Sequence, residues 1–193
     1  MRQAVFLDRD GVINPLVYNL NTGEYESPHQ SGEFSVYPQT ARSLQRLSAA
    51  GFLLFLVSNQ PSYAKGKTTL EHIRAIQAVL AEYLQENKIG FAGFYYCHHH
   101  PDGIVPGYSG TCVCRKPSPY FLQQAASEHG LDLSQSWLIG DQDSDVLCGQ
   151  AAGVRTIQIL NPHSAAKRGA SRPEFRAENL AEAVELLLMR KEG

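Results

Sequence analysis

Two aspartates follow the first apolar run of the chain. The segment "AVFLDRDGVIN" places Asp8 and Asp10 directly after four apolar residues, with Gly11 behind them. Three more polar residues end later apolar runs: Ser58, Asn59 and Asp141. A single aspartate after a strand is often a turn or N-cap residue. In an open parallel sheet, however, residues at the carboxyl ends of the strands meet at one edge, so these side chains are expected to share a site.

Several carboxylates at one edge suit phosphoryl transfer to a carboxylate nucleophile. A carboxylate approaching a phosphate about 4 Å away is repelled by roughly 4 kcal/mol at an effective dielectric constant near 20. A cation must offset this repulsion. Mg²⁺ prefers carboxylate, phosphate and water oxygens, and Lys116 in "CRKP" offers a further positive charge. The sequence therefore predicts a Mg²⁺-assisted phosphoryl-transfer site.

A second cluster of reactive residues spans about 97–114. Three thiols and one imidazole match the ligands of tetrahedral zinc with no open position, which indicates a structural site: Cys97, His99, Cys112 and Cys114. The alternatives are unrelated loop cysteines, a catalytic zinc or a nucleic-acid-binding knuckle. Four filled ligands and a formal net charge of -2 argue against the last two. The flanking His98 and His100 are expected to face solvent or to support the ligands.

Short apolar runs alternate with amphipathic segments, a pattern that predicts an α/β fold with a parallel sheet. Strands are predicted at residues 4–8, 52–59, 91–97, 136–141 and 154–160. Helices are predicted at residues 39–50, 68–87, 118–129, 143–152 and 177–191. Two long loops, 15–38 and 98–117, interrupt this alternation, and loops of that length are usually functional.

The whole chain of 193 residues is 43% hydrophobic, which fits a single domain spanning residues 1–193. Its mixed charges give no basic field for nucleic acid and no polybasic patch for a membrane. No apolar stretch approaches the 18 or so residues of a membrane span, and the N-terminus lacks the apolar run of a signal peptide. We therefore expect a cytoplasmic protein. Cys148, outside the cluster, is expected to be a small buried residue.

Four segments, in order, resemble the motifs of the haloacid dehalogenase superfamily of phosphatases: "DRDGVIN", "SNQ", "RKP" and "GDQDSD". The resemblance spans nearly the whole chain. It implies a three-layer Rossmann-like fold, with a parallel sheet covered by helices on both faces. Neither interval in which the superfamily inserts a large cap domain has room for one here, so a capless member with a zinc-binding loop is implied.

The resemblance also implies the catalytic roles. Asp8 corresponds to the nucleophile that forms an aspartyl-phosphate. Asp10 corresponds to the general acid that protonates the leaving oxygen and then activates water. Mg²⁺ would be held by Asp8, the backbone carbonyl of Asp10, and Asp141.

The same motifs imply residues that bind the phosphoryl group. Ser58 and Lys116 would bind its oxygens, with the amide of Asn59 close by. Asp145 would orient either Lys116 or a metal-bound water. Asp143 is expected to begin a helix.

The zinc loop narrows the resemblance, because "YYCHHHPDG" and "CVCRKP" are similar to heptose bisphosphate phosphatases and to their histidinol-phosphate phosphatase relatives. The segment "SNQPSYAKGKTT" resembles only the first group, whose pattern is "NQSGIARGKF". Arg115 and Lys65 would then contact the sugar phosphate that is retained. Pro61 and Ser62 depart from the family's Ser-Gly.

The loop at 15–38, the expected substrate loop, is longer than in the family. Its tyrosines, and Tyr37 at its end, either line the pocket or pack on their own scaffold: Tyr18, Tyr25 and Tyr37. Because this departure bears on the substrate, the exact sugar depends on the shape of the loop.

The predicted function is Mg²⁺-dependent removal of the 7-phosphate from D-glycero-D-manno-heptose 1,7-bisphosphate, a step toward nucleotide-activated heptose for surface glycans such as lipopolysaccharide. The substrate is a small phosphorylated sugar, and we expect a monomer with no nucleic-acid or membrane partner. One alternative is a phosphatase acting on histidinol phosphate or another small sugar phosphate. Another is a zinc-stabilised binding protein without catalysis, which the intact catalytic positions disfavour.

Overall fold

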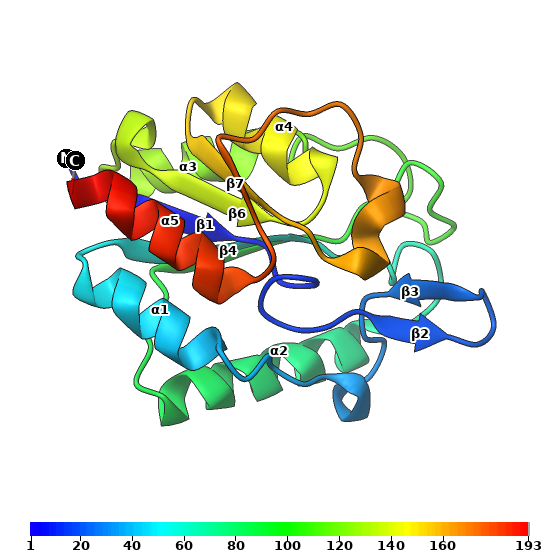
Figure 1. Ribbon diagram of the computed structural model, residues 1–193. Helices are drawn as coiled ribbons and strands as arrows, with labels where there is room; N and C mark the ends of the chain where they lie inside the picture. Colours follow the sequence, from blue (N-terminus) through cyan, green and yellow to red (C-terminus); the bar gives the residue numbers. More distant parts are fainter. Residues whose placement is uncertain (193) are drawn as a thin grey trace.

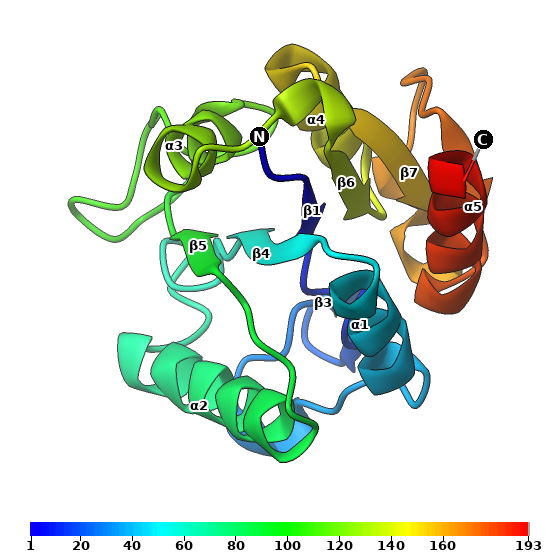
Figure 2. The same cartoon turned by 90° about the vertical axis from the view of Figure 1, so that its left-hand side faces the viewer.

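The computed structural model describes residues 1–192, which form a six-stranded parallel sheet between two layers of helices (Figure 1). The strand order is β5 (Gly93–Cys97), β4 (Leu53–Asn59), β1 (Ala4–Leu7), β6 (Trp137–Gly140), β7 (Arg155–Ile159) and β8 (Phe175–Ala177). The helices are α1 (Thr40–Ala49), α2 (Leu70–Glu86), α3 (Tyr120–His129), α4 (Asp143–Ala152) and α5 (Leu180–Glu192). Figure 2 shows α3 and α4 on one side of the sheet and α1 and α2 on the other.

This architecture confirms the predicted three-layer α/β fold. Each predicted strand and helix is present, with ends shifted by a few residues; the predicted strand at 91–97, for example, begins at Gly93. The short strand β8 and a two-stranded antiparallel hairpin, β2 (Val17–Asn19) and β3 (Glu24–Glu26), were not predicted. The hairpin lies in the predicted substrate loop and projects beyond the sheet (Figure 1).

Strand β1 lies at the centre of the sheet. It pairs in parallel with β4 and β6, so that Leu7 is opposite both Leu56 and Ile139. All four residues of β1 are buried, because helices cover both faces of the sheet. The carboxyl ends of β1, β4 and β6 are therefore adjacent.

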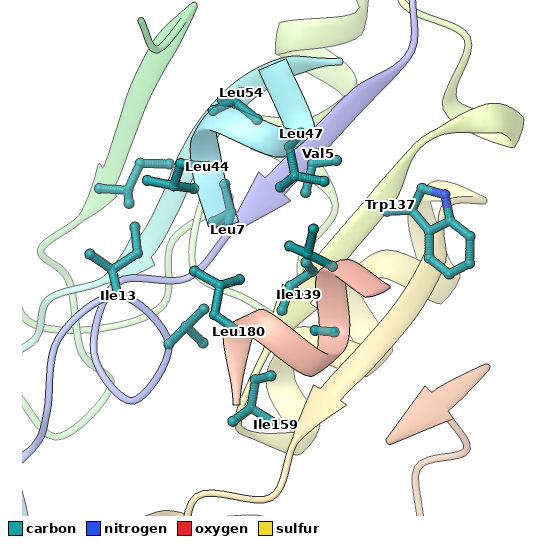
Figure 3. Close-up of a cluster of buried hydrophobic side chains, with 14 of the residues drawn as sticks. Val5, Leu7, Ile13, Leu44, Leu47, Leu54, Trp137, Ile139, Ile159 and Leu180 are labelled. Atoms are coloured by element: carbon teal, nitrogen blue, oxygen red, sulfur yellow. The ribbon is translucent and has the colours of Figure 1, made fainter. Parts of the chain in front are cut away.

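Alternate residues of β1 face two separate hydrophobic cores. Val5 and Leu7 pack with residues of α1 and α5, including Leu44, Leu47 and Leu180 (Figure 3). Ala4 and Phe6 belong to the other core, beneath α3 and α4. Each large side chain fully buried in this way contributes about 1.5–3 kcal/mol to stability. These contacts hold β1 in place and thereby fix the position of the residues that follow it.

Within residues 1–192, no helix combines the length and apolar character that crossing a membrane requires.

Candidate active site

The loop after β1 turns back on itself at once. The amide of Gly11 donates a hydrogen bond to Asn14 O (2.7 Å), and the amide of Ile13 donates one to Arg9 O (2.8 Å). Gly11 has φ +86°, and a Cβ there would lie 2.2 Å from Asp141 Oδ2. Only glycine fits both the backbone conformation and the space. The loop after β1 therefore passes directly against the carboxylate that ends β6.

Three carboxylates meet at this point. Oxygens of Asp8, Asp141 and Asp145 lie within 4.8 Å of one another, and all three residues are buried. Burial, together with Asp145 and Asp8, raises the pKa of Asp141 well above its ordinary value. Burial likewise raises the pKa of Asp8 to about 6, although Lys116 opposes this shift.

This cluster fits a divalent cation. Both carboxylate oxygens of Asp141 are buried and lack a hydrogen-bond partner within the described part of the chain. Buried, unpaired carboxylate oxygens are costly unless a cation neutralises them. A hard cation such as Mg²⁺ takes oxygen ligands of this kind.

Lys116 lies between two of these aspartates. Its Nζ is 3.1 Å from Asp8 Oδ1 and 2.6 Å from Asp145 Oδ1, and it donates a hydrogen bond to Val57 O (2.7 Å). Burial alone would lower the pKa of Lys116, but Asp145 and Asp8 raise it above its ordinary value. Of the two partners considered for Asp145, the structure places it against the lysine.

The end of β4 supports this arrangement. The side chain of Asn59 accepts a hydrogen bond from Lys116 N (3.0 Å) and donates one to Lys116 O (3.1 Å). Ser58 is buried close enough to Asp8 to lower the pKa of that carboxyl group, against the larger effect of burial. Asn59 thus fixes the main chain of Lys116, whereas Ser58 lies beside the carboxylate of Asp8.

These groups open into a cavity of about 250 Å³. Its lining includes the predicted residues Asp8, Asp10, Asn59, Lys65, Arg115 and Lys116, together with His100 and Lys167. Lys167 ends the 3-10 segment Pro162–Lys167, and nothing in its sequence context, "AAKRG", marked it as a site residue. His100 was expected to face solvent or to support the zinc ligands, but it lines this cavity.

Several basic residues that line the cavity lie close to one another. Burial lowers the pKa of Lys65, and the nearby Lys67, Arg115 and Lys167 lower it further. Burial also lowers the pKa of His100, with Lys65 and Arg115 adding to the effect. Cations that depress one another's pKa values in this way favour an anionic ligand.

The tyrosines of the substrate loop are absent from the lining of the active-site cavity. The Tyr25 ring stacks on His163 with ring centroids 3.6 Å apart, and Tyr18 packs on Tyr25 at 5.3 Å. Tyr37 lines a separate hollow of about 190 Å³, to which Gly11 also contributes. Of the two possibilities considered for these tyrosines, the structure favours packing on the scaffold, although Tyr25 also lines a small hollow that adjoins the active-site cavity.

The four predicted zinc ligands come together at the end of β5, where Cys97 lies, and in the loop that follows it. Cys112 Sγ is 3.6 Å from both Cys97 Sγ and Cys114 Sγ, and His99 Nδ1 is 3.9 Å from the latter two sulfurs. Tetrahedral zinc with bonds of about 2.3 Å holds its sulfurs roughly 3.8 Å apart, so the cluster is compatible with structural zinc. Arg115 donates a hydrogen bond to His99 O (3.2 Å), which links the cluster to the cavity.

Comparisons with known proteins agree with this geometry. The family described as HAD-hydrolase-like matches residues 113–183. The chain is 34% identical over 157 residues to D-glycero-beta-D-manno-heptose-1,7-bisphosphate 7-phosphatase of Yersinia pestis, covering 81% of this chain and 79% of the relative. It is 30% identical over 188 residues to the enzyme of the same name from Pasteurella multocida, covering 97% of both.

A solved structure is also similar over nearly the full length. D,D-heptose 1,7-bisphosphate phosphatase from B. bronchiseptica, complexed with magnesium and phosphate, superposes with a TM-score of 0.79 at 25% identity. The match covers 98% of this chain and 99% of that one. The chain therefore belongs to the heptose-1,7-bisphosphate 7-phosphatase family of haloacid dehalogenase-like hydrolases.

Proposed function

We propose that the protein is a Mg²⁺-dependent phosphatase that removes the 7-phosphate of D-glycero-D-manno-heptose 1,7-bisphosphate. The observation that carries this proposal is one cavity with two sites for anions. Asp8 and Lys116, which lie in ion-pair contact, make one of them, and Lys65, Arg115 and Lys167, whose charges interact, make the other. A bisphosphate would place its reacting phosphate at the first site and its retained phosphate at the second.

In the proposed reaction, the Asp8 carboxylate attacks phosphorus, and the bond to the C7 oxygen breaks to leave an aspartyl-phosphate. Asp10, whose pKa Arg9, Asn14 and Gln60 lower against the effect of burial, takes up a proton when the anionic substrate binds. It gives that proton to the departing oxygen and then accepts one from the water that attacks the aspartyl-phosphate. Inorganic phosphate leaves, and Asp8 is regenerated.

The phosphoryl oxygens bind to Lys116 and Ser58 in this scheme. Magnesium would be held by Asp8, the Asp10 carbonyl and Asp141, and when bound it neutralises charge on the phosphoryl group. Lys116 lies within ion-pair distance of Asp8, so its positive charge stays next to the attacking carboxylate in each step of the reaction.

The alternative substrate, histidinol phosphate, carries an amino group and no second phosphate. The positive charges of Lys65, Arg115 and Lys167 would repel that amino group, and no second phosphate would be present to neutralise them. A single catalytic domain, a monomeric state and a cytoplasmic location remain predictions from the sequence.

The decisive variant is Asp8→Asn, which removes the attacking oxyanion while keeping the size of the side chain. Phosphate release from the bisphosphate should fall at least 10³-fold, whereas the circular dichroism spectrum should stay unchanged. Full activity of this variant would rule out the mechanism. A substrate panel with both anomers of the bisphosphate, heptose 7-phosphate and histidinol phosphate would separate the proposed activity from its alternatives.

A further inference from the structure

The carboxylate of Asp10 is enclosed by a buried network of hydrogen bonds. Oδ1 accepts from Arg9 Nε (3.1 Å), Arg9 Nη2 (3.0 Å) and Asn14 Nδ2 (2.9 Å). Oδ2 accepts from Arg9 Nη2 (3.1 Å) and from Gln60 Nε2 (2.5 Å). Arg9, Asn14, Gln60 and Asp10 are each at most 4% exposed. The orientation of this carboxylate is thus set by protein groups from both sides.

Gln60 is the residue that connects this network to the rest of the site. Its Nε2 donates to Ser58 Oγ (3.0 Å) as well as to Asp10, and its Oε1 accepts from Arg9 Nη2 (2.7 Å). Its backbone amide donates to Cys97 O (2.7 Å), just beyond the end of β4. One side chain therefore joins the proposed general acid to the proposed phosphate-binding serine.

Arg9 contacts the other side of the Asp10 carboxylate, although burial of its guanidinium is energetically unfavourable. Its side chain is fully buried, lies over the Phe34 ring at 5.7 Å, and leaves Nη1 without a hydrogen-bond partner in residues 1–192. A buried guanidinium is expensive unless it is paired, and its pairing here is with Asp10. A bidentate contact of this kind fixes geometry as well as charge.

We propose that Gln60 and Arg9 are positioning residues that aim the Asp10 carboxyl group at the leaving-group oxygen. The proposal rests on the proposed function, in which Asp10 transfers that proton. Without Gln60, the Asp10 side chain loses a hydrogen bond to Oδ2 and its link to Ser58. Proton transfer to the sugar oxygen then takes place from a less constrained geometry.

The test compares leaving groups, because p-nitrophenolate departs as a stable anion and a sugar alkoxide does not. We would measure kcat/KM, which reports the first phosphoryl transfer, for heptose bisphosphate and for p-nitrophenyl phosphate. In Gln60→Met, kcat/KM for the bisphosphate should fall about 10- to 100-fold, since a general acid contributes about 10²–10⁴-fold. For p-nitrophenyl phosphate it should fall less than about threefold, because little protonation is needed.

Gln158→Met is the matched control, because Gln158 is equally buried but its amide lies near Asp143. This variant should lower both kcat/KM values by the same factor. Equal losses on the two substrates in Gln60→Met, or no loss on either, would overturn the proposal. If Gln60→Met does not fold, Arg9→Lys gives the same comparison from the other side of the network.

Asp10→Asn separates this proposal from the proposed function. A wild-type protein inactive on both substrates would remove the function itself. Equal losses on the two substrates in Asp10→Asn would remove the role of Asp10 as acid. A selective loss in Asp10→Asn that is absent from Gln60→Met would remove only the positioning role.

Discussion

The carboxylates of Asp8 and Asp141 are the groups whose charge depends most on what binds beside them. Burial raises the pKa of both, to about 6 for Asp8, because each carboxylate is withdrawn from water and faces other aspartates. A carboxyl group whose pKa is raised on folding reduces stability as pH rises from its unfolded value through its folded value. A bound cation would remove this penalty.

We therefore predict that Mg²⁺ binds more weakly in acid. Protons compete with the metal below pH 6, and Asp8 alone would reduce the affinity about tenfold between pH 7 and pH 5. Calorimetric titration of the protein with Mg²⁺ at the two pH values measures the difference. An affinity that is equal at pH 5 and pH 7 would contradict the raised pKa values.

Asp8 and Asp141 could be predicted as site residues from the sequence, because each directly follows an apolar strand and a parallel sheet brings the ends of its strands together. Arg9 and Gln60 lie inside the same motifs, but their contact with Asp10 could not be predicted, since nothing in a linear sequence shows that their side chains turn toward its carboxylate. Lys167 could not be found in this way. It reaches the cavity through a 3-10 segment after β7, and its neighbours in the sequence form no recognisable pattern.

The loop from Cys97 to Cys114 leaves the large apolar side chains of Ile104 and Val113 exposed, so hydrophobic burial contributes little to holding it. Its ligands are close enough for zinc, and Arg115 follows the last of them. Zinc would thus hold the main chain that delivers Arg115 and Lys116 to the cavity. Without the metal, thiols and an imidazole alone would give this loop little stability.

We predict about one zinc per chain, retained after mild EDTA treatment, whereas activity should vanish with EDTA and return with Mg²⁺. Cys112→Ser should lose zinc and unfold at a temperature at least several degrees lower, at about 2–4 °C for each kcal/mol in a chain of this size. Metal analysis and thermal melts check both results. Cys148→Ser is the control and should retain zinc, because Cys148 is a buried cysteine that does not belong to the four-residue cluster. Protein without zinc would show that the loop assignment is wrong.

The predictability of the elements followed their burial. Strands β1, β4 and β6 were predicted because they are continuous apolar runs in the middle of the sheet. Strand β8 and the hairpin strands have only three residues each, and the hairpin strands are exposed or half-buried, so their residues form no apolar pattern. The hairpin is held instead by contacts between distant residues, such as the ion pair of Lys67 with Glu26.

At the scale of the whole molecule, the proposed second anion site is assembled from three distant segments. Lys65 follows β4, Arg115 ends the zinc loop, and Lys167 lies after β7. The formal net charge of the chain is -2, so this local concentration of cations is not a general property of the surface. An anionic substrate is then drawn to the cavity itself.

Lys167→Ala should accordingly weaken recognition of the retained phosphate and spare the chemistry. We expect KM for the bisphosphate to rise about tenfold, the loss of roughly 1.4 kcal/mol from one charge-assisted contact, with kcat within about twofold. KM for heptose 7-phosphate, which lacks the second phosphate, should change little. Arg176→Ala, which removes an exposed positive charge on β8, should leave both constants unchanged. An equal rise of KM for the two substrates in Lys167→Ala would show that Lys167 does not read the second phosphate.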